Sequence, residues 1–319
     1  MTDVYDKFIA KLREKMPQKK VLVDYIAKVL SIEKDSAYRR LRGDVAFSFQ
    51  EVTILARRLN LSLDELTSYD KDFKSRPYYY SSIDYIHPEE DDYRMLEVYL
   101  NFFQAIKDDP NTEMGATCKI IPDAFKGNYP YINRFYLFKQ VAQYGEGNDY
   151  PHFKDIVMPT QMEKLVSNLM GSYRLVKNAS YIMDKQMFCN IVHETRYFAE
   201  LKLIDKEDIL ALKKELLDIL DYLEGIAAKG HNELGNKVNF YVSDINFDND
   251  FFYILSSIHS FNLLRAFTLN DIISTDSVSM QKFRQCVQSL KRKSVLISES
   301  GEITRIKTFN EQRDYVNAL

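Results

Sequence analysis

Residues 26–66 constrain the fold of this chain more than any other segment. They contain two short amphipathic helical patterns, and the second of them, residues 34–42, is rich in Lys and Arg. An isolated helix of this length is marginal in water, so neighbouring elements must hold it in place. A short basic helix that is held in this way has the size and charge that the major groove of DNA accepts.

Apolar spacing predicts three short helices before Gly43. They cover residues 4–16, 21–30 and 34–42, and each has apolar side chains three or four positions apart. Gly43 follows the third helix, at the position where glycine commonly ends a helix. The second and third helices are separated by residues 31–33 alone, which predicts a tight turn between them.

Two capping signals predict two more helices in the same region. Ser48 is followed three residues later by Glu51, and Ser62 by Glu65. This spacing is typical of capping boxes, in which each side chain bonds to the other residue's backbone N–H at a helix start. The sequence therefore predicts a compact domain of five short helices over residues 1–70.

This pattern resembles the lambda-repressor-like, Cro/XRE-type helix-turn-helix domain, and the resemblance is limited to residues 1–70. The positions that match the family pattern are Ile26, Ala27, Leu30, Ile32, Ala37, Gly43, Ser48, Val52, Leu55, Ala56, Leu59, Leu61, Ser62, Asp64 and Leu66. The positions that depart from it are Ser31 for the turn glycine, Glu33 for a serine cap, Leu41 for a glutamate, Phe47 for a proline, and Leu22 and Val23 for the polar start of the first motif helix.

The resemblance implies that residues 34–42 form the recognition helix of a transcriptional regulator that binds double-stranded DNA. Base edges would be met by Lys34, Asp35, Ser36 and Tyr38, a base or the backbone by Arg39, and phosphates by Arg40, Arg42, Lys19 and Lys20. Lys and Arg pair with guanine acceptors, and Asp accepts from cytosine. The alternative is a solvated, charged helix face in a protein-interaction adaptor of the same fold.

Charge is distributed unevenly along the chain. Residues 1–60 contain 13 Lys or Arg and 8 Asp or Glu, whereas the whole chain carries a net charge of −3. A mildly basic head on an acidic body suits a protein whose head alone meets DNA. Because the positive excess is small, one head should bind weakly, and we expect a homodimer that binds two half-sites.

The rest of the chain is expected to form a larger, mostly helical α+β domain over residues 91–319, after a connector at residues 71–90. Helices are predicted over residues 90–107, 130–144, 159–175, 185–201, 206–229, 279–293 and 303–318. A strand is predicted at residues 114–122, and a small antiparallel meander near residues 237–270. The predicted fold class is thus mainly α, with 319 residues divided into two or three domains.

The sequence contains no motif that predicts catalysis, a cofactor or a metal. A nucleophile elbow, a phosphate-binding glycine loop and an HExxH pair are absent from it. Cys189 and His193 share a helical face, but further zinc ligands are not evident. Three widely spaced cysteines and the lack of a long apolar run predict a cytoplasmic protein without a membrane partner.

The body is rich in Tyr and Phe, which line ligand pockets and ordinary cores alike. Two roles therefore stay open for residues 91–319: dimerisation or protein docking, and the sensing of a small-molecule or peptide effector. An unrecognised enzyme is a third, less favoured interpretation. We expect the whole protein to be a sequence-specific transcription regulator and not an enzyme.

Overall fold

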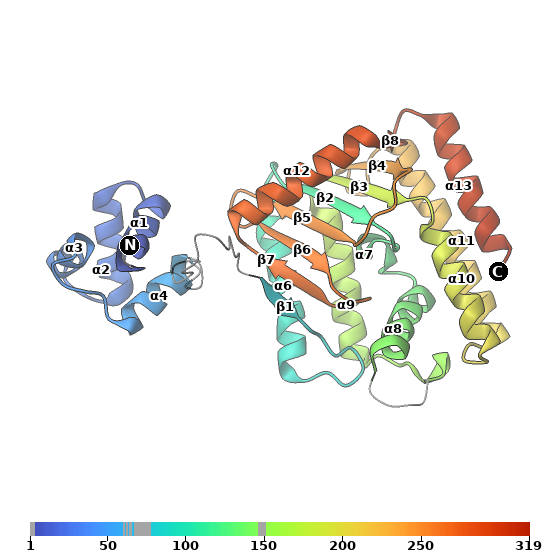
Figure 1. The fold of residues 1–319 in the computed structure, drawn as a ribbon, viewed down its shortest axis with the longest axis horizontal. Coiled ribbons are helices and arrows are strands. Elements are labelled where there is room, and N and C mark those ends of the chain that lie inside the picture. The colour runs from blue at the N-terminus through green and yellow to red at the C-terminus, as the bar shows by residue number, and fades with distance from the viewer. Residues whose placement is uncertain (1–3, 60, 62, 64–65, 67–77, 146–150) are drawn as a thin grey trace. The chain divides into compact units, whose positions relative to one another are not determined.

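The computed structural model describes residues 4–59, 61, 63, 66, 78–145 and 151–319. The chain divides into two compact units, residues 1–77 and 78–319 (Figure 1). Each unit has its own hydrophobic core. Among the described residues, no helix combines the length and the apolar content that a bilayer crossing requires.

The first unit is built from short helices. They are α1 (Val4–Lys15), α2 (Lys19–Leu30), α3 (Lys34–Arg42) and α4 (Phe49–Leu59). These bounds follow the predicted periodicity closely. The predicted fifth helix falls on a segment in which residues 62, 64 and 65 lie outside the described part of the chain.

The core of the first unit receives apolar side chains from all four helices. Phe8 and Leu12 of α1 meet Ile26 of α2 and Leu55 of α4 there. Leu22 and Leu41, which depart from the family pattern, are also buried in this core. These two departures therefore fill the interior and leave no apolar patch on the surface.

The second unit contains both helices and strands. Its helices are α6 (Glu90–Ile106), α7 (Asp123–Lys126), α8 (Pro130–Tyr144), α9 (Thr160–Ser172), α10 (Met187–Glu200), α11 (Lys206–Lys229), α12 (Ser277–Lys293) and α13 (Glu302–Asn317). Its strands are β1 (Tyr79–Ser81), β2 (Glu113–Cys118), β3 (Asn178–Asp184), β4 (Lys237–Ser243), β5 (Phe251–Leu255), β6 (Phe261–Arg265), β7 (Asp271–Ser274) and β8 (Val295–Leu296).

All eight strands join one mixed sheet in the order β1-β7-β6-β5-β2-β3-β4-β8. The predicted meander over residues 237–270 is wrong in one respect, because β4 runs parallel to β3 and does not pair with β5. The antiparallel meander consists of β5, β6 and β7. The sequence pattern does not predict β3, because all but the first residue of this strand are buried. The strand therefore lacks the alternation of a half-exposed strand.

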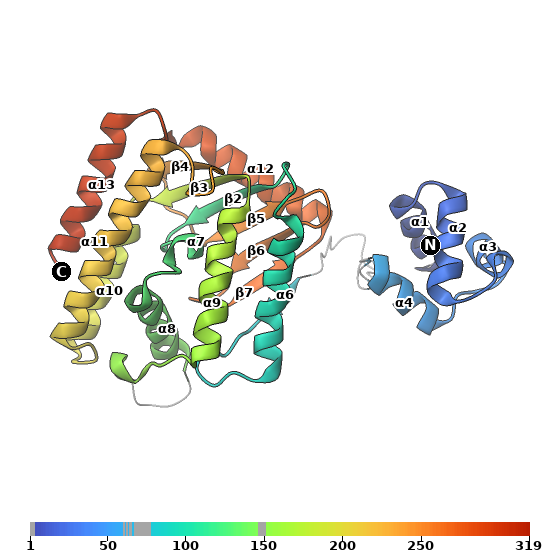
Figure 2. The same cartoon turned by 180° about the vertical axis from the view of Figure 1, so that it is seen from behind.

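Helices cover both faces of this sheet (Figures 1 and 2). Helix α12 covers one face, where Met280 and Val287 pack with Ile182 of β3 and Tyr253 of β5. Helices α6, α7, α9 and α11 lie on the opposite face, and α13 packs on α10 and α11. The larger core lies between the sheet and this second group of helices.

Part of the predicted connector belongs to the sheet. Residues 79–81 form strand β1, which pairs antiparallel with β7 at one edge. The side chains of Tyr79 and Tyr80 are exposed, whereas Ser81 is buried. Residues 78–90 of the predicted connector are thus grouped with the second unit.

Candidate functional site

The solvent-facing side of α3 carries most of the residues predicted to contact DNA. Lys34, Asp35 and Arg39 are exposed, whereas Ala37 and Leu41 are buried in the core of the unit. An α-helix with its side chains is about 10–12 Å across, close to the major-groove width of about 12 Å. The helix is thus narrow enough for the groove and is anchored from behind.

The cations on this side of α3 differ in how they are paired. Lys34 Nζ lies 2.6 Å from Asp24 Oδ1, and Arg42 Nε lies 3.2 Å from Asp44 Oδ2. Both cations remain largely exposed, so water screens these pairs strongly. Among the described residues, no side chain pairs with Arg39. Arg39 is therefore the exposed cation of α3 whose guanidinium has no side-chain partner among the described residues.

Tyr38 lies between two cations. Lys19 Nζ donates a hydrogen bond to Tyr38 Oη at 3.1 Å and lies 4.5 Å from the centroid of its ring. The Arg42 guanidinium lies 5.9 Å from the same centroid. The hydrogen bond from Lys19 lowers the pKa of Tyr38. These contacts link the start of α2 to α3 and gather positive charge at one place on the surface.

Arg40, for which a phosphate contact is predicted, makes its side-chain contacts within the first unit. Its Nη2 lies 3.0 Å from Glu51 Oε1 of α4, and both side chains are less than one-fifth exposed. Its Nη1 donates to the carbonyl of half-buried Ser36 at 3.3 Å, and its own carbonyl accepts from Tyr5 Oη at 3.0 Å. Arg40 therefore holds α3 against α1 and α4.

The start of α2 is positively charged. Lys19 and Lys20 occupy its first turn, which contains no acidic residue and no side-chain cap. Lys20 is exposed and has no partner within the described residues. Cations at a helix N-terminus oppose the helix dipole, and a bound anion reverses that penalty. This arrangement suits a DNA phosphate.

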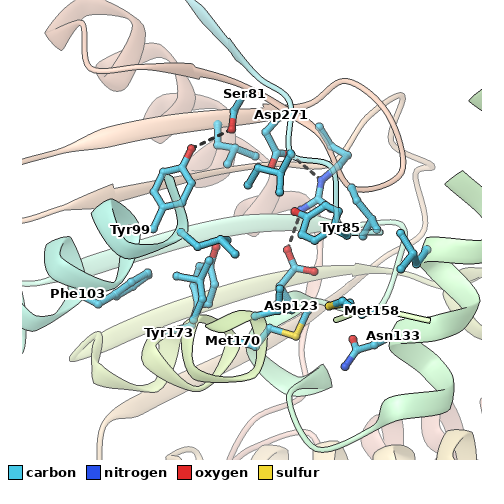
Figure 3. A pocket seen from close by; sticks show the side chains of 18 of the residues that line it. Ser81, Tyr85, Tyr99, Phe103, Asp123, Asn133, Met158, Met170, Tyr173 and Asp271 are labelled. Atoms are coloured by element: carbon cyan, nitrogen blue, oxygen red, sulfur yellow. Dashed lines mark hydrogen bonds and ion pairs between the residues drawn. The ribbon is translucent and has the colours of Figure 1, made fainter. Parts of the chain in front are cut away.

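The second unit contains a cavity between the sheet and helices α6, α8 and α9 (Figure 3). Its volume is about 80 Å³, several times the space that one water molecule needs. Most of its wall is formed by Leu, Ile, Val, Met and Phe side chains. Its polar groups include Ser81, Tyr99, Asp123, Asn133 and Asp271.

A chain of charged groups crosses one wall of the cavity. Arg265 Nη2 lies 2.8 Å from Asp123 Oδ2, and Arg265 Nε lies 2.7 Å from Asp271 Oδ1 without hydrogen-bond geometry. The second oxygen of Asp123 lies 2.6 Å from Nζ of Lys126, whose side chain is fully buried. Asp123 thus has two cationic partners, and Asp271 has one that it shares.

The two carboxylates of this wall therefore differ in acidity. Burial opposes ionisation of Asp123, but Lys126 and Arg265 outweigh it and hold the pKa of Asp123 well below its usual range. Burial raises the pKa of Asp271 to about 7, since Arg265 compensates it only in part and the charge of Asp123 adds repulsion. Asp271 is consequently the weaker acid of the two carboxyl groups.

Sequence reasoning identified none of these cavity residues. They lie on β1, α6, α7, α8, β6 and β7, so only the folded sheet brings them together. The spacing of Cys189 and His193 likewise has no counterpart in a metal site: within the described residues, no three His, Cys, Asp or Glu side chains gather to hold a metal ion.

Comparison with known proteins adds no further constraint. No protein-family model, no curated protein and no solved structure matches this chain. The functional interpretation therefore depends on the geometry described above.

Proposed function

We propose that this protein is a sequence-specific DNA-binding transcription regulator that acts as a homodimer. The observation that supports it most is the two-sided character of α3: Lys34, Asp35 and Arg39 face solvent, while Ala37 and Leu41 fix the helix to its unit. A rigid helix with exposed cations and one exposed acceptor suits base readout in the major groove.

Phosphate contacts complete this proposal. Lys19, Lys20 and Arg42 supply positive charge at the start of α2 and the end of α3. Such contacts position a protein on the duplex without reading its sequence. Arg40 is left out of the proposed interface because its guanidinium is engaged with Glu51.

The test is selection of genomic fragments by the purified full-length protein, followed by mobility-shift titration at low and moderate salt. We expect recurrent enrichment of a two-fold-symmetric site with half-sites about 34 Å apart. Its affinity should exceed that for random DNA by about 1000-fold or more. Equal binding to all fragments would contradict the proposal.

A second candidate function is a protein-interaction adaptor, and one observation favours it. Phe49 at the start of α4 is 81% exposed, which is unusual for a phenylalanine in a small unit. Comparison of Phe49→Ser with Arg39→Ala separates the two functions. A DNA-binding head should lose site recognition with Arg39→Ala, while an adaptor should lose its partner with Phe49→Ser.

A further inference from the structure

We propose that the cavity of the second unit binds a small protonated amine that carries an apolar group. The cavity offers a carboxylate oxygen that accepts no hydrogen bond from the described residues, together with aromatic walls, and both features select for such a ligand. Binding itself depends only on the cavity. The ligand's role as the effector that controls DNA binding rests on the function proposed above.

Two acceptor oxygens at the cavity are free. Asp271 Oδ2 accepts no hydrogen bond from the described residues, and Asp271 keeps 17% of its side chain exposed. Asn133 Oδ1 is buried and also has no donor among the described residues. Asn133 Nδ2 donates to the carbonyl of Lys126 at 2.9 Å, which fixes the amide and leaves its oxygen as the unused atom. A buried acceptor without a donor is costly, so a ligand that donates here is favoured.

The charged wall excludes an anionic ligand. Arg265 is engaged with its neighbours, since Nη1 donates to the carbonyl of Thr268, Nη2 donates to Asp123, and Nε lies 2.7 Å from Asp271 Oδ1 without hydrogen-bond geometry. Lys126 is not part of the cavity wall, and its ammonium lies against Asp123 and the ring of Tyr136. Arg265, the cationic side chain of the cavity wall, is therefore held between the carboxylates of Asp123 and Asp271, which leaves little positive charge for an anion.

Aromatic rings surround the same space. Tyr85, Tyr99, Phe103 and Tyr173 line the cavity, and Figure 3 shows Tyr99 and Tyr85 on the same side as Asp271. The faces of aromatic rings attract cations, and the attraction strengthens when the cation is removed from water. A carboxylate together with aromatic rings recognises an ammonium group, and the Leu and Met side chains of the wall accommodate an apolar substituent.

Benzylamine is a suitable probe because it joins an ammonium group to one small ring. Benzyl alcohol and benzoate have nearly the same shape but are neutral and anionic. Isothermal titration calorimetry of the full-length protein at about pH 8 should show benzylamine binding about tenfold or more tighter than benzyl alcohol, as expected for a hydrogen bond to a charged group. Benzoate should not bind. Equal binding of benzylamine and benzyl alcohol, or no benzylamine binding, would overturn the proposal.

Substitutions locate the site. Asp271→Asn should remove the preference for benzylamine and leave the affinity for benzyl alcohol within about threefold. The matched control is Asp91→Asn, since Asp91 lies on α6 with a side chain that is 86% exposed, and this variant should behave as the wild type. An unchanged preference in a folded Asp271→Asn protein would contradict the assignment.

A second variant covers the case in which Asp271→Asn does not fold, as judged by circular dichroism. Asn133→Leu removes the other free acceptor and should weaken benzylamine binding about three- to tenfold, with an unchanged affinity counting against the proposal. The calorimetric titration is performed without DNA, so it tests ligand binding alone. A protein that binds benzylamine but no DNA would refute the proposed function alone, and a protein that binds DNA but no amine would refute this inference alone.

Discussion

Arg40 of α3 and Glu51 of α4 form an ion pair, with Nη2 and Oε1 separated by 3.0 Å. Glu51 also accepts from the backbone N–H of Ser48 at 2.8 Å, while Ser48 Oγ accepts from the N–H of Glu51 at 3.2 Å. Burial opposes ionisation of Glu51, but the hydrogen bonds from Ser48 and Arg40 outweigh it and lower its pKa. The Glu51 carboxylate thus caps the start of α4 and also links α4 to α3.

Replacement of Glu51 by Ala should loosen the first unit. The change removes a cap and leaves Arg40 without its partner, for an expected loss of about 1–3 kcal/mol. Hydrogen–deuterium exchange of the full-length protein should show faster exchange of the α3 and α4 amides. Glu14→Ala is the control, because Glu14 is 71% exposed in a surface pair. Equal protection in both variants would show that the Arg40–Glu51 pair is dispensable.

Arg39→Ala should weaken specific binding more than binding to random DNA. A base contact by an exposed Arg contributes about 1–3 kcal/mol of discrimination, and the buried side of α3 is untouched by this change. Competitive mobility shifts with the selected site and with random DNA measure both affinities. Equal losses on the two DNAs would remove Arg39 from base readout.

Lys20→Ala should weaken binding to both kinds of DNA to a similar extent. A phosphate contact releases about one counterion, so the slope of log K against log salt should become shallower by about 1. Titrations at several salt concentrations give this slope. A slope equal to that of the wild type would show that Lys20 does not contact phosphate.

Ser31→Gly should stabilise the first unit. Ser31 has a φ of +53°, in the left-handed region that costs a non-glycine residue about 1–2 kcal/mol. The greater chain entropy of glycine offsets part of this, so a net gain of about 0.5–1 kcal/mol is expected. Slower amide exchange in α2 and α3 would report it. Ser31→Ala serves as control and should give no such gain.

Asp271→Asn should change how the stability of the second unit depends on pH. The folded pKa of about 7 lies above the usual value, so the stability that protonated Asp271 contributes is present below about pH 4 and lost as pH rises through 7. Arg265, Asp123 and Lys126 are the charged groups that face it.

Because the variant lacks this titration, its unfolding free energy relative to that of the wild type should rise by about 2–3 kcal/mol between about pH 5 and pH 8. Urea denaturation at several pH values measures the difference. A difference that stays constant across this range would mean that Asp271 titrates normally.

The sequence predicted the helices of this protein well and its strands poorly. The period of apolar residues in α11 marks its bounds, because its buried residues are mostly three or four positions apart and lie on one side. β3 is buried on both faces, and β1 and β8 have three and two residues, so none of them carries a period of its own.

The two candidate sites also differ in how well the sequence predicts their residues. The residues of α3 are contiguous, so their spacing alone predicts which of them face solvent. Arg40 is the exception, because spacing does not indicate its pairing with Glu51 eleven positions away. The cavity joins Arg265 to Asp123 across 142 positions. No local pattern reports a contact over that distance, because it forms only when the sheet and its helices assemble.

Strands β1 and β8 form the two edges of the sheet, and in sequence they lie near the start and near the end of the second unit. If either segment were trimmed, β7 or β4 would present a bare row of backbone donors and acceptors, which invites pairing with another chain. Truncated variants of the second unit must therefore keep Tyr79 of β1 and Leu296 of β8, or we expect them to aggregate.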